Sequence, residues 1–206
     1  MKKAFDPVSF HRTSVYGTGL PAFLKAFFIM LLIIPATQAM DVEQLMEQLA
    51  QSTYSTAHFT EHKYLHSLSK PLELNGILKY TAPDHFVKQT LQPKMETMTI
   101  DGDTLTVERS GRARTLQLQD YPVMQAFVEC IRGTMRGNLK ALRQYYDLDL
   151  SGDQQHWQMT LLPKDASLRK VVDTILISGS TSHIDTIEIR ETRGDRSVMN
   201  IARDEQ

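Results

Sequence analysis

The segment MTIDGDTLTV, Met98 to Val107, consists of two short runs separated by Asp101-Gly102-Asp103. In the second run, Thr104 to Val107, polar and apolar residues alternate, which is the period of a half-buried strand. Asp and Gly tolerate the backbone angles that a tight hairpin turn requires. The segment therefore predicts two antiparallel strands joined by a turn.

A catalytic interpretation of the same segment is also possible. Haloacid-dehalogenase-like phosphatases present a nucleophilic aspartate after an apolar strand, and there a loop and a helix follow. Here a second strand follows Asp103, and related Gly-Asp pairs recur where turns are expected, at Gly152-Asp153 and Gly194-Asp195. The turn is favoured over the hydrolase, which stays as an alternative that requires a turnover dependent on Asp101.

Outward from this hairpin, most of the chain shows strand signals bounded by turn residues. The expected strands are Ala57 to Leu68, Leu72 to Tyr80, His85 to Leu91, Met95 to Ile100, Thr104 to Glu108, Arg114 to Leu118, Tyr146 to Leu150, Trp157 to Leu162, Val171 to Ser178, Ile184 to Glu191 and Val198 to Ala202.

Helical periodicity occurs in two places. Asp41 can cap a first helix, and a mid-chain pair of helices is entered at Pro122 and Asn138, the first of them ending near Gly133. Strands do not alternate with crossover helices, so a parallel α/β sheet is not expected. The pattern predicts a mainly β, antiparallel meander with an N-terminal helix and a mid-chain helical insert.

The first 39 residues have the pattern of a cleaved secretory signal. A basic leader precedes the apolar run Ala26 to Ile34, Pro35 breaks it, and Thr37-Gln38-Ala39 supplies small residues for cleavage. The run is far shorter than the roughly 20 apolar residues that span a bilayer. An uncleaved anchor is the alternative. We expect a single exported domain over residues 40–206.

Charge and cysteine content exclude some classes. The leader contains four basic residues and one acid, a net charge of +3, so subtraction from the chain's −1 leaves −4 for residues 40–206. An acidic chain without a basic cluster is a poor candidate for nucleic-acid binding. Cys130 is the one cysteine, and its place in an apolar helical pattern indicates a small buried hydrophobe rather than a nucleophile.

Several short motifs, taken in order, resemble the outer-membrane lipoprotein carrier family, the LolA-like proteins. They are Phe59-Thr60-Glu61, Gly76-Ile77-Leu78 ahead of Pro83, Asp101-Gly102-Asp103-Thr104-Leu105, Leu161-Leu162-Pro163-Lys164, and a closing strand pair joined through Gly194-Asp195. The resemblance implies a strongly curved, incompletely closed β-barrel with an apolar concave face and a helical lid over a cavity for acyl chains.

Two departures from the family pattern point to a divergent member. The lipoprotein carriers have an Arg just before the proline matched by Pro83, and its hydrogen bonds hold the lid closed. Ala82 stands at that position here, so that role is not carried over. The chain also ends soon after the strand at Val198, where lipoprotein carriers continue. Divergent members are associated with other acylated or polyene lipids.

The resemblance favours a cavity-lining role for apolar residues that would otherwise be assigned to an ordinary core. The expected lining is Leu74, Leu78, Tyr80, Phe86, Met98, Ile100, Val107, Leu116, Phe127 and Ile131. Basic residues at helical spacing on the insert suggest a contact with a lipid head group, by Arg132 and Arg136 first of all; a solvated helix face is the alternative.

Two other motifs are interpreted without a functional role. His58, His62 and His66 recur every fourth residue, but on a strand such neighbours are about 13 Å apart, too far to share one metal ion. Arg193-Gly194-Asp195 spells an integrin-binding tripeptide and is interpreted as a hairpin turn. We expect no metal, no cofactor and no catalytic residue.

The expected function is that of a monomeric periplasmic carrier. It would bind the acyl chains of a lipoprotein or another acylated lipid, and move this cargo from an inner-membrane releasing complex to an outer-membrane acceptor, as the resemblance implies. The alternative is a periplasmic sensor that uses the same cavity to detect mislocalised lipid and reports to a membrane partner.

Overall fold

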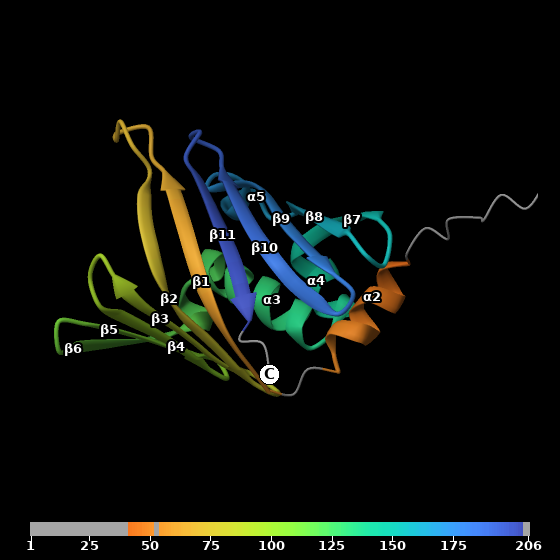
Figure 1. The fold of residues 1–206 in the computed structure, drawn as a ribbon, viewed down its shortest axis with the longest axis horizontal. Helices are drawn as coiled ribbons and strands as arrows, with labels where there is room; N and C mark the ends of the chain where they lie inside the picture. The colour runs from red at the N-terminus through yellow and green to blue at the C-terminus, as the bar shows by residue number, and fades with distance from the viewer. Residues whose placement is uncertain (1–40, 52–53, 204–206) are drawn as a thin grey trace, which may run out of the picture. The chain divides into compact units, whose positions relative to one another are not determined.

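The computed structural model describes residues 41–51 and 54–203 (Figure 1). These residues belong to one compact unit, Gln38–Gln206. The signal peptide expected over residues 1–39 lies outside the described residues.

The described residues form eleven strands in a single sheet (Figure 1). All neighbouring strands pair antiparallel, in the order β6-β5-β4-β3-β2-β1-β11-β10-β9-β8-β7. The strands are β1 (Tyr54–Tyr64), β2 (Leu72–Thr81), β3 (His85–Gln92), β4 (Glu96–Asp101), β5 (Thr104–Arg109), β6 (Arg112–Gln117), β7 (Tyr146–Gly152), β8 (Trp157–Pro163), β9 (Val172–Ser180), β10 (His183–Glu191) and β11 (Arg196–Arg203).

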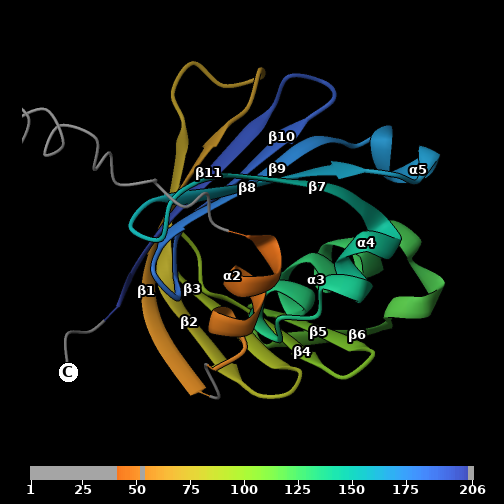
Figure 2. The ribbon, with the colours of Figure 1, turned by 90° about the vertical axis from the view of Figure 1, so that its right-hand side faces the viewer.

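The sheet is open, because β6 and β7 are its two edges and do not pair with each other. It curves around the helices, which lie on its concave side (Figure 2). Strands β1 to β6 and strands β7 to β11 each pair in chain order, and the pairing of β1 with β11 joins the two sets. The predicted antiparallel half-barrel with helices is confirmed.

Four α-helices and a short 3₁₀ helix accompany the sheet in the described part of the chain. They are α2 (Val42–Leu49), η2 (Leu118–Asp120), α3 (Pro122–Met135), α4 (Leu139–Tyr145) and α5 (Ala166–Arg169). Asp41 caps α2 and Asn138 caps α4 through their side chains, while Pro122 begins α3. These three starts agree with the expected ones, because side-chain caps and a first-turn proline act locally. No helix among the described residues is long and apolar enough to cross a membrane.

The hairpin interpretation of Asp101-Gly102-Asp103 is confirmed. Asp101 pairs with Thr104 at the end of β4 and β5, and Gly102 adopts a φ of +54°, which favours glycine. The interpretation of Arg193-Gly194-Asp195 as a turn is confirmed as well, since Gly194 has a φ of +90° between β10 and β11.

Two details differ from the expectation. The first strand ends at Tyr64 rather than at Leu68, and the chain turns where the carboxylate of Asp195 accepts hydrogen bonds from the backbone N–H and the ring Nδ1 of His66, both at 2.8 Å. Helix α5 was not expected, because four residues are too few to show periodicity. Its start depends on the Asp165 carboxylate, which accepts from the backbone N–H of Ser167 and Leu168.

Strands β2 and β3 approach each other closely at Gly76. A Cβ at this position would lie 1.9 Å from the carbonyl oxygen of Gln89 and 2.9 Å from a ring carbon of Phe59. A register shift between Asn75 and Gly76 occurs at the same place. Neither neighbour can yield without moving a strand or a buried ring, so only glycine fits here.

We therefore expect Gly76→Ala to lower the free energy of unfolding by about 3 kcal/mol, as overpacking against fixed backbone does. Urea unfolding checks this through the fluorescence of Trp157, the chain's one tryptophan, which is buried. Gly111→Ala is the matched control. Its Cβ would meet nothing within 4 Å, and its φ of +71° limits the loss to about 1 kcal/mol. Equal losses at both positions would contradict the close-approach argument.

Candidate functional site

A cavity of about 1100 Å³ lies between the concave face of the sheet and helices α2 and α3. Partners across an antiparallel ladder share a face, so the inward positions follow from the register. Ala57 of β1 stands opposite Leu78 of β2, and Phe59 stands opposite Ile201 of β11. The middle of the sheet therefore presents an almost continuous apolar surface to the cavity.

The two ends of the curved sheet are filled by side chains, and the middle is not. One cluster joins α2, α3 and α4 to β7, β8 and β9, and includes Leu45, Tyr146 and Trp157. A second cluster joins Val128 of α3 to Leu105 and its neighbours on β4 and β5. Between them, inward residues of β10 and β11 stay only half-buried, among them Ile187, Ile189, Met199 and Ile201. The cavity lies between the two clusters, and members of both, such as Ile177 and Leu105, form part of its lining.

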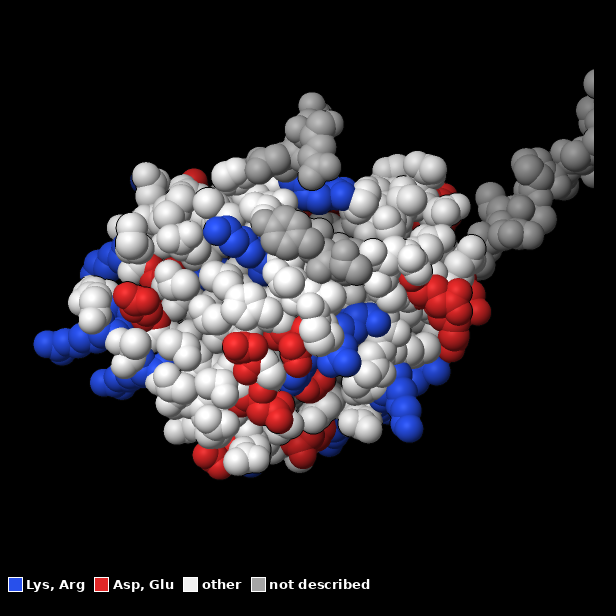
Figure 3. Space-filling view, turned by 90° about the horizontal axis from the view of Figure 1, so that it is seen from below, with Lys and Arg blue, Asp and Glu red and all other residues white. Residues whose placement is uncertain are grey.

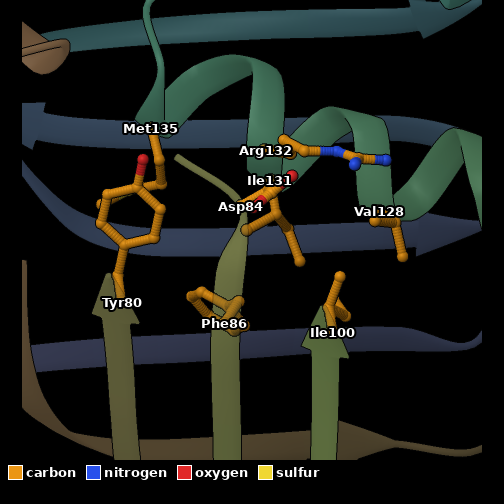
Figure 4. A pocket seen from close by; sticks show the side chains of 8 residues that line it. All are labelled: Tyr80, Asp84, Phe86, Ile100, Val128, Ile131, Arg132 and Met135. Carbon is orange, nitrogen blue, oxygen red and sulfur yellow. The ribbon is translucent and has the colours of Figure 1, made fainter. Parts of the chain in front are cut away.

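Helix α3 closes one side of the cavity over the ends of β2, β3 and β4. In Figure 4, Val128, Ile131 and Met135 of α3 point toward Tyr80, Phe86 and Ile100 of the strands. The three helix residues recur at positions i, i+3 and i+7, so they share one face of α3. This contact is apolar and tight, because the pocket that the residues enclose holds only about 10 Å³.

Arg132 ties α3 to the β4–β5 hairpin. Its Nη1 donates to the carbonyl oxygen of Gly102 at 3.1 Å, and its Nη2 lies 2.5 Å from Glu129 and 3.7 Å from Asp103. The side chain is only 10% exposed, and its Nε finds no hydrogen-bond partner among the described residues. Asp103 adds a second tie, since its carbonyl oxygen accepts from the backbone N–H of Leu118 at 2.9 Å.

Seven of the ten residues expected to line the cavity do lie along it: Leu78, Tyr80, Phe86, Met98, Ile100, Phe127 and Ile131. Val107 and Leu116 pack instead against the second cluster, and Leu74 lies outside the lining. Contact of these residues with a lipid stays a prediction, as does a head-group contact of Arg132 or of the exposed Arg136.

The sequence interpretation missed the part of the lining that comes from β9, β10 and β11. Ile177, Ile187 and Met199 belong to it. Their alternation is visible in the sequence, but alternation does not say whether the space beyond a face is filled. It also missed α2, whose Gln48 and Leu49 reach the same cavity.

A charged cluster interrupts the apolar lining at β1. The Glu61 carboxylate accepts from Lys88 Nζ at 2.5 Å and from Ser197 Oγ at 2.6 Å, and Lys63 Nζ lies 3.6 Å away. Burial alone would raise the pKa of Glu61, but the charge and hydrogen bond of Lys88, the Ser197 hydroxyl and the charge of Lys63 together hold this pKa below its usual value. Glu61 is therefore ionised at the cavity on the concave side of the sheet.

The remaining candidates from the sequence are the cysteine and the histidines. Burial raises the pKa of the Cys130 thiol to about 12, so this side chain is the buried hydrophobe that was expected. His62 Nε2 lies 3.7 Å from Glu73, while His66 contacts Asp195. Within residues 41–51 and 54–203, no group of three or more His, Cys, Asp or Glu side chains is placed to hold a metal ion.

Both signs of charge are present on the outer surface. On the face shown in Figure 3, acidic side chains gather near the centre and basic side chains lie around them. A backbone of phosphates would meet repulsion as well as attraction on this face.

The ion pair of Glu61 makes stability depend on pH. A carboxyl whose pKa is lowered by folding contributes stability that is present above its unfolded pKa of about 4.5 and is lost as pH falls through the folded value. We expect Glu61→Gln to cost about 3 kcal/mol at neutral pH, because Lys88 loses its partner, and we expect the cost to shrink below pH 4.5. Urea titrations from pH 7 to pH 3 measure this.

Glu108→Gln, an exposed carboxyl on β5, is the control for that titration. Its effect on stability should be small and nearly constant over the same pH range. A Glu61→Gln cost that does not change with pH would exclude the ionised pair as its source.

Comparison with known proteins gives one family and several distant folds. Among curated protein sequences, none matches this chain. A LolA superfamily protein from Nitrosomonas europaea is similar at 9% identity and a TM-score of 0.44, over 82% of this chain and 96% of that chain. The MucA/MucB complex of Pseudomonas aeruginosa is similar at 12% identity and a TM-score of 0.43, over 81% and 59%. Lipoprotein LppX of Mycobacterium tuberculosis is similar at 10% identity and a TM-score of 0.38, over 78% and 93%.

At these identities and TM-scores the similar structures say nothing of what this chain binds. The sequence profile of a family is more informative, because it spans the whole described fold. The profile described as outer membrane lipoprotein carrier protein LolA-like matches residues 34–203, from before α2 to the end of β11. The chain therefore belongs to the LolA-like family of outer-membrane lipoprotein carrier proteins.

Proposed function

We propose that this protein binds the acyl chains of a lipoprotein or another acylated lipid in its cavity, and carries them through the periplasm from the inner to the outer membrane. The observation that supports this most is the apolar cavity of about 1100 Å³, which is at the upper end of the roughly 300–1000 Å³ typical of ligand pockets. Transfer of each CH₂ from water into such a space is worth about 0.8 kcal/mol, so binding needs no cofactor.

The ionisable side chains at the cavity support binding rather than catalysis. Glu61 is held in an ion pair with Lys88, and Cys130 keeps its proton because burial raises the pKa of its thiol. Asp101 and Asp103, the residues of the hydrolase alternative, have exposed side chains on the hairpin turn and do not belong to the cavity lining. We infer that the protein is a carrier rather than a hydrolase. A monomer that meets a releasing complex and an acceptor is part of the same proposal.

Helix α3 is the part of the structure best suited to act as a lid. It covers the cavity with Phe127 and Ile131 and is joined to the strands below it by apolar contacts and by Arg132. In the family an arginine holds the lid, and its matched position here is Ala82. We propose that Arg132 holds α3 instead, through the carbonyl group of Gly102.

We expect a fluorescent fatty-acyl probe to bind the protein with one saturable site, and Ala57→Phe to weaken this binding at least tenfold. Ala57 is buried and lines the cavity, so a phenyl ring there takes up space that the acyl chain needs. Probe titration measures the affinity, and native mass spectrometry of protein purified from periplasm identifies the natural cargo.

Thr60→Phe is the control for that experiment, since Thr60 lies on β1 with its side chain on the other face. It should leave the affinity within about twofold. A protein that takes up no probe and has a clean apo mass would remove the carrier proposal, and a protein-binding role would then account for the fold better.

We expect Arg132→Gln to release α3. The substitution removes the guanidinium contact with Gly102 and leaves Glu129 without its 2.5 Å partner, which should cost about 1–3 kcal/mol. Hydrogen exchange of α3 amides should become about tenfold faster or more, and probe uptake should quicken, because the lid opens more often.

Arg143→Gln is the matched control, because Arg143 makes an exposed pair with Glu43 at 3.1 Å between α4 and α2. Such a pair contributes about 0–1 kcal/mol, so exchange in α3 should hardly change. Equal protection of α3 in the wild type and in Arg132→Gln would show that apolar contacts alone hold the lid.

A further inference from the structure

The cavity and the rest of the protein differ in the sign of their charge. Residues 40–206 have a net charge of −4, obtained above from the chain's −1 and the leader's +3. The charged residues of the cavity lining are two acids and four bases, a net charge of +2. The acids are Glu61 and Asp185, and the bases are Lys63, Lys79, Lys88 and Arg203. The apolar cavity of this acidic protein is therefore lined by an excess of positive charge.

Only two of the four bases lie close together. Lys63 and Lys88 both converge on Glu61, with Nζ–Oε distances of 3.6 Å and 2.5 Å. We call Glu61, Lys63 and Lys88 the cationic cluster. Its two ammonium groups and one carboxylate give it a net charge of +1. Lys79 and Arg203 are exposed instead.

The cationic cluster is built into the sheet rather than spread on the surface. The side chain of Lys88 is 19% exposed and that of Glu61 6%. The Lys88 ammonium also lies 4.9 Å from the centre of the Phe59 ring. Lys63, at 38% exposure, is the member that can move toward a ligand. Fixed position and partial burial are what distinguish a binding group from a solvated charge.

An acyl chain in the cavity would displace water from this cluster. Glu61 compensates one ammonium group, so a neutral ligand would leave a positive charge next to apolar atoms, which is costly. A ligand that brings one anionic group would compensate this charge with a charge-assisted hydrogen bond. The cavity therefore favours an anionic amphiphile over a neutral one with the same acyl chain.

We propose that the cargo is an anionic amphiphile, whose carboxylate or phosphate binds Lys63 and Lys88 while its acyl chain extends beneath α3. This deepens the proposed function and rests on it. The cationic cluster lies farther along the sheet than the lid contact. Phe86 at the lid contact pairs with Tyr80, which pairs with Ser55 of β1, whereas Glu61 lies six residues farther along β1. The head group then lies at the end of the cavity away from Arg132 and Arg136.

The test is displacement of a neutral fluorescent acyl probe by four ligands of equal chain length: dodecanoate, dodecyl phosphate, dodecanol and dodecyltrimethylammonium. We expect at least one of the two anions to displace the probe at about tenfold lower concentration than dodecanol does, as a charge-assisted hydrogen bond implies. The cation should be the weakest ligand. Comparison of the two anions tells a carboxylate from a phosphate head group, and added salt should reduce the preference.

Three substitutions of Lys63 locate the head group. Lys63→Gln neutralises the cluster but keeps the pair of Glu61 with Lys88, so it should abolish the anion preference without changing the affinity for dodecanol. Lys63→Arg should keep the preference, and Lys63→Glu should reverse it in favour of the cation. Lys140→Gln, the same neutralisation at an exposed position of α4 outside the cavity lining, is the control and should keep the preference.

Two results would overturn the proposal. One is displacement by all four ligands at equal concentrations, which leaves acyl binding intact and removes only the anionic head group. The other is loss of the preference in Arg136→Gln but not in Lys63→Gln, which places the head group at the lid instead. Displacement by none of the ligands, together with no probe uptake, would remove the carrier function itself.

Discussion

An open sheet that curves around helices without closing can pack its inner face only where those helices come near it. Here α3 meets β4 and β5 on one side, and α2, α3 and α4 meet β7, β8 and β9 on the other. Packing at both ends stabilises the fold, while β1, β10 and β11 between them keep inward residues such as Ile187 and Met199 half-buried. The packed clusters and the cavity therefore share residues, such as Ile177 and Leu105, and the unfilled space lies between the two packed ends.

The hairpin Asp101-Gly102-Asp103 connects this geometry to the lid. As a turn it needs only the positive φ of Gly102. The two carbonyl groups that the turn exposes then serve the helical insert: that of Gly102 accepts from Arg132, and that of Asp103 accepts from the backbone of η2. A motif that could belong to a phosphatase is thus the anchor of α3. Its aspartate side chains are exposed, and its backbone accepts the hydrogen bonds that connect the turn to α3 and η2.

Family membership and the cavity together support a carrier of acylated molecules, and the charges inside the cavity narrow the proposed cargo. Burial of acyl chains is non-directional, so an apolar cavity by itself accepts any chain of suitable length. A partly buried cluster such as Glu61, Lys63 and Lys88 adds direction, because a charge close to apolar contents must be compensated. The acyl chain of the cargo would then provide the affinity, and the cationic cluster would provide the orientation and the selectivity.

Local chemistry determined much of this protein from sequence alone. The side-chain caps at Asp41 and Asn138, the start of α3 at Pro122, the turns at Gly102 and Gly194, and the strand alternation all depend on neighbouring residues, and all were predicted. Features that depend on residues far apart in the sequence were not predicted. Alternation marks Val107 and Met98 alike as inward, and both pack against the second cluster, yet only Met98 also lines the cavity, which tertiary structure decides. Arg132 and Gly102, and Glu61 and Lys88, are 30 and 27 residues apart, so tertiary structure alone decided which charges meet.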